Sequence, residues 1–119
     1  MNIEELYKKM KNNVNGIVII KDNKLIWTLP NNVEFEVSCN AYQNEGYIEL
    51  NYYRNNKKIN VTHFHPMDDE IYNELNFFDK NVIWYKKKGI FNFDRPIWWI
   101  EKEKFDKLSE RKKAKYIII

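Results

Sequence analysis

The sequence predicts a single α+β domain built on an antiparallel sheet of about six or seven strands, a five-strand meander plus two. Two observations favour this class. Short segments of alternating apolar and polar residues follow one another between turn residues, and three other segments space their apolar residues as helices do. The chain has 119 residues, 44% of them hydrophobic, which suffices for one core. We therefore expect one domain over residues 1–119.

An N-terminal helix is expected over residues 3–14. Asn2 is placed to cap this helix, with Glu5 at the third helical position, and Gly16 is expected to end it. Its apolar residues share one helical face: Ile3, Leu6, Tyr7, Met10 and Val14.

Five short apolar segments then predict the meander. Asp22 and Asn23 supply the turn between the first two segments, which form a hairpin. In the third segment Glu34, Glu36 and Ser38 alternate with apolar residues, which predicts one buried and one solvated face. The five segments are 17–20, 24–29, 33–39, 47–53 and 59–65.

The remaining elements are a helix, two strands and a basic C-terminal helix. Pro66 suits the first position of the second helix, whose apolar stripe is Met67, Ile71, Leu75 and Phe78. Strands are expected over 81–85 and 96–100, and the basic helix over 105–116.

The cysteine content and the N-terminal residues predict a cytoplasmic protein. Cys39 is the only cysteine, so no internal disulfide can form, which suits a reducing compartment. Residues 1–10 lack the apolar stretch of a secretion signal, and no segment reaches the ~20 apolar residues of a membrane span. Alternation places Cys39 on the apolar side of its strand, which predicts a buried, inert thiol. The abundance of Lys, Asn and Ile suggests a bacterial or mobile-element origin.

The charge is segregated along the chain. The net charge is +3, and residues 103–116 contain six basic and three acidic residues. Residues 30–53 contain four glutamates and no Lys or Arg. The middle of the chain is therefore acidic and its end basic.

Both histidines lie in one short pattern. The spacing His-x-His-x4-Glu, formed by His63, His65 and Glu70, resembles half of the first metal-binding motif of cupins. Two imidazoles and a carboxylate suit Zn, Fe or Mn. The flanking glycines of that motif are missing, and the chain has no third histidine. The alternative is that these histidines line a strand and that Glu70 favours the N-terminus of the next helix.

Sequence signatures of the common enzyme classes are absent. The chain has no Gly-rich phosphate-binding motif and no nucleophile elbow, and it has only three glycines. We therefore expect a non-enzymatic protein without a cofactor.

The basic C-terminal helix offers a nucleic-acid role as a further alternative. Lys86 to Lys88 and the neighbouring Trp84 and Tyr85 supply the residue types that phosphate neutralisation and base stacking need. A net charge of only +3 with an acidic middle argues against nucleic acid as the main partner.

The outward face of the third and fourth strands is the preferred candidate site. Tyrosine is enriched at protein interfaces, and an acidic patch attracts a basic partner. We therefore expect a protein-binding module that covers its partner as toxin-immunity proteins do. The alternative is an ordinary solvated sheet face, or a face covered by one of the three helices. The candidate partner-binding residues are Glu34, Glu36, Tyr47, Glu49, Asn51 and Tyr53.

Two adjacent tryptophans, Trp98 and Trp99, must point to opposite faces of a strand. One of them is expected in the core, and the other is either covered by a helix or exposed.

Overall fold

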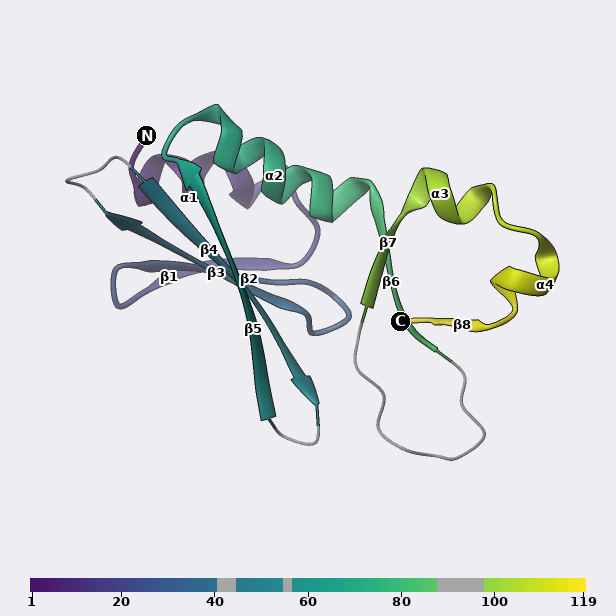
Figure 1. The fold of residues 1–119 in the computed structure, drawn as a ribbon. Coiled ribbons are helices and arrows are strands. Elements are labelled where there is room, and N and C mark those ends of the chain that lie inside the picture. Colours follow the sequence, from purple (N-terminus) through teal and green to yellow (C-terminus); the bar gives the residue numbers. More distant parts are fainter. Residues whose placement is uncertain (41–44, 55–56, 88–97) are drawn as a thin grey trace.

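The computed structural model describes the backbone of residues 1–40, 45–54, 57–87 and 98–119, and the side chains of 1–39, 64–86 and 98–119. Figure 1 shows the elements of this α+β fold in chain order. They are α1 (Ile3–Lys11), β1 (Ile17–Lys21), β2 (Lys24–Thr28), β3 (Glu34–Asn40), β4 (Glu45–Arg54), β5 (Lys57–Pro66), α2 (Asp69–Lys80), β6 (Val82–Lys87), β7 (Trp98–Glu101), α3 (Lys102–Asp106), α4 (Glu110–Lys113) and β8 (Tyr116–Ile118).

Strands β1 to β5 form the predicted antiparallel meander, in which each strand pairs with the next one along the chain. Asp22 and Asn23 link β1 to β2 with φ angles of 53° and 61°. A two-residue hairpin turn of type I′ requires left-handed backbone at both of these positions, and Asp and Asn tolerate it. The turn residues therefore fix the register of this hairpin.

Helix α1 begins as the sequence predicts. The backbone N–H of Glu5 donates to Oδ1 of Asn2 over 2.8 Å, which confirms the N-cap. The helix ends earlier than expected, at Lys11. Gly16 instead serves the entry to β1. Its φ is +91°, and a Cβ there would overlap the carbonyl oxygen of Thr28, so only glycine fits.

Helix α2 begins later than expected. Pro66 is the last residue of β5, and the N-cap is Asp68, whose Oδ1 accepts a 2.8 Å hydrogen bond from the backbone N–H of Glu70. The N-cap position favours a side chain that accepts a hydrogen bond from a free N–H group of the first turn, and Asp68 supplies this acceptor whereas proline cannot. The predicted stripe is confirmed, since all four residues are buried: Met67, Ile71, Leu75 and Phe78.

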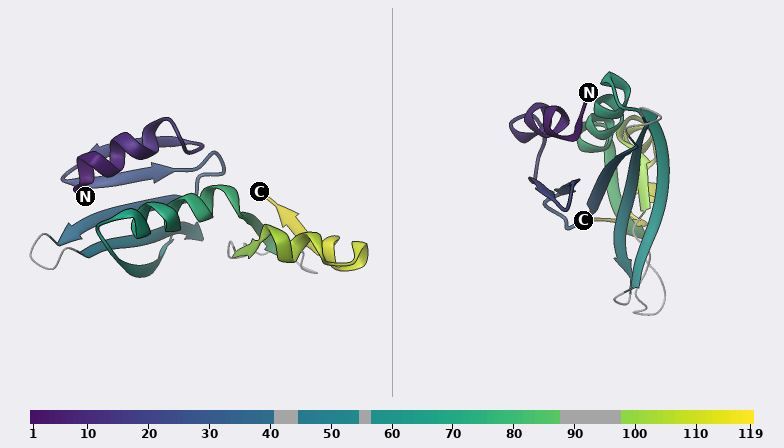
Figure 2. Two further views of the ribbon diagram at one scale, coloured as in Figure 1. Left: turned by 90° about the horizontal axis from the view of Figure 1, so that it is seen from above. Right: turned by 90° about the vertical axis from the view of Figure 1, so that its left-hand side faces the viewer.

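Both long helices pack on the same face of the five-stranded sheet. Figures 1 and 2 show α1 over β1 and β2, and α2 starting at one end of β5 and running at a steep angle to that strand. Leu6 and Met10 of α1 are fully buried against this face. The sheet contributes the alternate residues Leu25, Trp27, Val33, Phe35 and Val37 to the same core.

The expected single sheet of six or seven strands is wrong. Strands β6 and β7 belong to a second, three-stranded sheet with the order β7-β6-β8. Trp84 lies on the middle strand of this sheet, β6, and is buried. The centroid of its ring lies 6.1 Å from the ring centroids of both Phe35 and Phe78. The second sheet thus packs against the first through this aromatic contact.

The expected C-terminal helix over 105–116 is also wrong. Helix α3 ends at Asp106, Ser109 caps the short helix α4 through its hydroxyl, and Tyr116–Ile118 form strand β8 beside β6. Ser109 interrupts the helical pattern because its side chain competes for backbone donors. The β-branched isoleucines after it favour a strand.

The molecule measures 48 × 31 × 24 Å along its principal axes. Within the described residues, no helix combines the length and the apolar character needed to cross a membrane.

Candidate functional site

The face of the first sheet opposite α1 and α2 carries the predicted partner-binding residues. Residues that pair directly across antiparallel strands lie on the same face. Glu34 pairs with Asn51, Glu36 with Glu49, and Ser38 with Tyr47. Glu34 and Glu36 alternate with the buried core residues, so their positions belong to the opposite face, which we call the open face.

The register brings five of the six predicted residues into adjacent positions. Glu34 and Glu36 occupy β3, and Tyr47, Glu49 and Asn51 occupy the facing positions of β4. The sixth, Tyr53, lies two positions further along β4, opposite Lys58 of β5. The side chains of the four β4 residues lie outside the described part. Glu34 and Glu36 are half-buried.

Exposed apolar side chains flank these acidic positions on the outer strands. Ile17 and Ile19 of β1 are 68% and 45% exposed, and Phe64 of β5 is 61% exposed. Ile19 pairs with Ile26, which pairs with Glu36, and Phe64 pairs with Tyr47, so all lie on the open face. Ile17, Ile19 and Phe64 were not among the candidates that the sequence indicated. Carrying the alternation of residues 33–39 across the hairpin register would have placed Ile17 and Ile19 there.

Lysines lie at the margins of the same face. Lys21 and Lys24 pair with each other beside the β1–β2 turn, and Lys58 occupies the second position of β5. The acidic positions are therefore concentrated on the two central strands. The open face as a whole combines an acidic centre, apolar outer strands and basic margins.

The candidate metal residues lie on the other face, toward α2. His63 pairs with Ile48 and His65 with Gly46, in register with the core positions of β4. His65 and Glu70 both line a shallow pocket of ≈ 320 Å³ with Asn73, Glu74 and Phe77. No group of three metal-ligating side chains occurs among the described residues, which do not include the side chain of His63.

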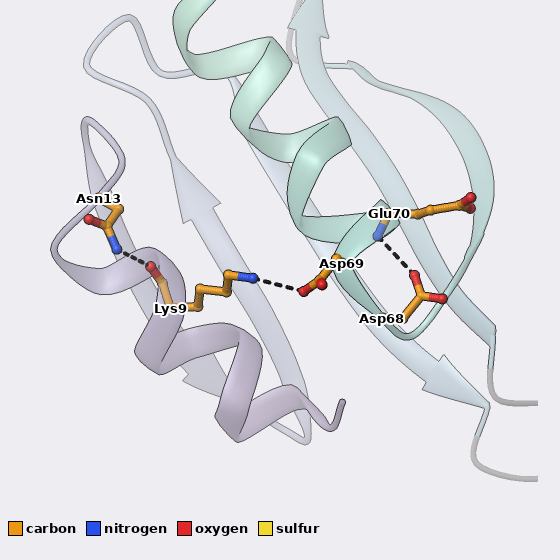
Figure 3. Close-up of polar contacts among 5 residues, drawn as sticks. All are labelled: Lys9, Asn13, Asp68, Asp69 and Glu70. Atoms are coloured by element: carbon orange, nitrogen blue, oxygen red, sulfur yellow. Dashed lines mark hydrogen bonds and ion pairs between the residues drawn. The ribbon is translucent and has the colours of Figure 1, made fainter.

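An ion pair connects the two long helices. Nζ of Lys9 in α1 donates to Oδ1 of Asp69 in α2 over 2.9 Å. This hydrogen bond, and then the lysine charge, lowers the pKa of Asp69 from its ordinary value of 3.8. Figure 3 shows Asp69 directed toward Lys9, while the side chain of Glu70 points the other way. Glu70 is therefore free of this bridge and available to the pocket.

Cys39 is exposed, and the prediction of a buried thiol is wrong. Alternation placed it on the core side of β3, but the core does not extend to this end of the strand. Cys39 instead lines a hollow of ≈ 400 Å³ with Asn2, Ile3, Glu4, Ile20 and Asn23.

Neither Trp98 nor Trp99 is buried, so the expectation that one of them lies in the core is wrong. Trp98 is 52% exposed and Trp99 is 40% exposed. Both lie on β7, an edge strand, whereas Trp84 on the central strand fills the core position. Trp99 packs edge-on against Phe77 and Phe78 of α2, with ring centroids 6.1 and 5.3 Å apart.

Tyr85 is buried on the side of the second sheet opposite Trp84. Its ring centroid lies 4.4 Å from that of Tyr116 on β8. Burial, and to a smaller extent the neighbouring Tyr116, raises the pKa of Tyr85. This phenol is therefore suited to packing as a neutral group.

In comparisons with known proteins, no family model, no curated protein and no solved structure matches this chain.

Proposed function

We propose that this chain is a non-enzymatic protein-binding module that covers a basic partner protein with the open face of its first sheet. The observation that carries the proposal is the coincidence of acidic and exposed apolar residues on the one face that α1 and α2 leave uncovered. Such a module would act by occlusion, in the manner of an immunity or inhibitor protein of a bacterium or mobile element.

The apolar residues would supply most of the binding energy. Interfaces depend on a few large side chains that become fully desolvated, and Phe64 and Ile17 are mostly exposed in the free chain. Burying a Phe or Ile side chain contributes about 1.5–3 kcal/mol. Two or three such anchors on a rigid sheet suit a specific interface.

The acidic centre would select the partner. Glu34, Glu36 and Glu49 occupy neighbouring register positions on β3 and β4. Complementary charges raise the association rate and disfavour partners of the same sign. A partner with a basic patch surrounded by apolar residues therefore fits this face.

Charge reversal at Glu34 and Glu36 tests the proposal. A partner is first captured from the native host and identified, and its affinity for the purified chain is then measured by calorimetry. The variant Glu34→Lys with Glu36→Lys should weaken binding by about tenfold or more, with a lower association rate. A matched control, Glu4→Lys with Asp106→Lys, makes the same charge change at exposed sites on α1 and α3 and should bind normally. Equal binding by all three proteins would exclude the open face.

The rival hypothesis is a metal-binding protein or metal-dependent enzyme centred on His63, His65 and Glu70. His65 and Glu70 share a pocket, so the rival has a location. Elemental analysis of the purified chain distinguishes the two hypotheses. A stoichiometric transition metal that is lost in His63→Ala and His65→Ala would favour the rival.

A further inference from the structure

The second sheet brings together basic residues that are far apart in the sequence. Lys86 and Lys87 at the end of β6 pair with Ile117 and Tyr116 of β8. Strand β8 directly follows α4 and Lys115, so the end of β6 lies beside the basic segment 111–115. Figure 1 shows α4 and β8 at the end of the molecule far from α1. We call the three residues Arg111, Lys112 and Lys115 the basic end.

These three cations have no ion-pair partner in the described part of the chain. All three are exposed. The neighbouring lysines differ, because each pairs with a glutamate: Lys104 with Glu101, Lys107 with Glu103, and Lys113 with Glu110. Unpaired charges of one sign in a short segment favour a polyanionic ligand.

An exposed aromatic ring lies on the same small sheet. Trp98 pairs with Tyr85, which pairs with Ile118, so Trp98 lies two strand spacings from β8, or about 10 Å. Tyr116 lies two residues back along β8, about 7 Å, and borders Lys115. The indole of Trp98 is 52% exposed. By the same spacings the backbone of Lys115 lies within about 15 Å of that of Trp98. Arg111 and Lys112 belong to α4, which precedes Lys115 in the chain.

We propose that the basic end and Trp98 form a binding site for single-stranded nucleic acid. The lysines and Arg111 would contact phosphates, and a base would stack on the Trp98 ring. Single-strand binding proteins combine these two elements, and stacking on an aromatic ring needs no particular base. The site lies on the second sheet, away from the open face, and does not depend on the proposed protein partner.

A membrane surface fits these residues less well. Three exposed isoleucines accompany the basic end, but they are divided between two faces: Ile118 shares the face of Trp98, whereas alternation places Ile117 and Ile119 on the other. They cannot enter one bilayer surface together, whereas a single exposed ring is sufficient for stacking.

Titration of fluorescein-labelled oligonucleotides tests the site. Twelve-residue oligo-dT and oligo-U are titrated with the whole chain, and fluorescence anisotropy is the readout. The salt concentration is varied from about 20 to about 200 mM, the range in which phosphate contacts dominate the affinity. The variant Arg111→Gln, Lys112→Gln, Lys115→Gln should bind at least about tenfold more weakly at low salt. The slope of log Kobs against log salt should fall by about 2, since each phosphate contact on a single strand contributes about 0.7.

A second variant tests the stacking contact. Trp98→Ala should weaken binding by about 5- to 150-fold, the loss expected for one stacked base, while Trp98→Phe should retain most of the affinity. Neither change should unfold the chain, because Trp98 is exposed on an edge strand. Comparing oligo-dT with oligo-U then shows whether DNA or RNA is preferred.

A matched triple variant controls for net charge. Lys8→Gln, Lys21→Gln, Lys24→Gln removes three exposed positive charges from α1, β1 and β2, at the other end of the molecule, and should bind like the wild type. Equal weakening by both triple variants would overturn the site. Failure of the wild type to bind either oligonucleotide at about 20 mM salt would also overturn it, because phosphate contacts are strongest at low salt. Binding to vesicles containing phosphatidylserine without binding to oligonucleotides would identify a membrane site instead and also overturn the proposal.

Discussion

Replacing Phe35 by alanine tests which face of the first sheet is the core. The Phe35 ring is fully buried, with centroids 4.9 Å from Trp27, 5.2 Å from Phe78 and 6.1 Å from Trp84. It therefore connects β2, α2 and the second sheet. Removing a buried phenylalanine side chain costs about 3–5 kcal/mol, because the transfer free energy is lost and a cavity remains.

That cost is a large share of the total stability. A chain of this length typically unfolds with about 6–18 kcal/mol, from 0.05–0.15 kcal/mol per residue. With a urea m-value of about 1.5 kcal/mol/M, the unfolding midpoint of Phe35→Ala should fall by roughly 2–3 M. Urea denaturation followed by far-UV circular dichroism and by tryptophan fluorescence measures this shift. Phe35→Leu, which keeps part of the volume, should show a smaller decrease.

Phe64→Ala is the matched control. Phe64 is also a phenylalanine of the first sheet, on β5, but it is 61% exposed and lies on the open face. Its replacement should change the free energy of unfolding by only about 0.5 kcal/mol. If Phe64→Ala destabilised the chain as much as Phe35→Ala, the assignment of core and open faces would be refuted, and with it the basis of the proposed function.

Three further predictions each concern a single structural feature: a helix cap, an ion pair and an exposed thiol. Asn2→Ala should lower the free energy of unfolding by about 1 kcal/mol because the N–H of Glu5 loses its acceptor, and Asn2→Asp should not; urea denaturation measures both. Lys9 lowers the pKa of Asp69, so the ion pair stabilises the folded chain above pH 3.8, and this contribution is lost as the pH falls through the lowered pKa. NMR titration of Lys9→Met should show the Asp69 pKa returning toward 3.8, and an unchanged pKa would contradict the contact. Cys39 should react with a thiol reagent in the native chain nearly as fast as in denaturant, whereas strong protection would contradict its exposure.

Local patterns predicted the features that depend on neighbouring residues. The alternation over residues 33–37 predicted the correct core face because the residues on one side of the strand are buried against the helices and those on the other are only half-buried. The cap at Asn2 and the turn at Asp22 and Asn23 were predictable because these side chains and φ angles act within a few residues.

Features that depend on distant parts of the chain were not predictable in this way. The helical spacing of Phe105 and Leu108 resembled the start of a long helix, but pairing with β6 draws Tyr116–Ile118 into a strand. Periodicity assigned Cys39 to a face without showing where the core stops. That the acidic positions of β3 and β4 lie side by side could be predicted from the meander alone. To place Ile17 and Phe64 on the same face, one needs the register of all four strand pairs.

The order of strands has a consequence for how the chain folds. In the first sheet every strand pairs with its sequence neighbour, so each pairing closes only a short loop, and such local contacts form quickly. In the second sheet β6 must wait for β8, which comes after β7, α3 and α4. We therefore expect the meander and α2 to assemble early and the second sheet to be completed late. An intermediate with a formed first sheet would expose Trp84, and slow burial of tryptophan in stopped-flow refolding would be its signature.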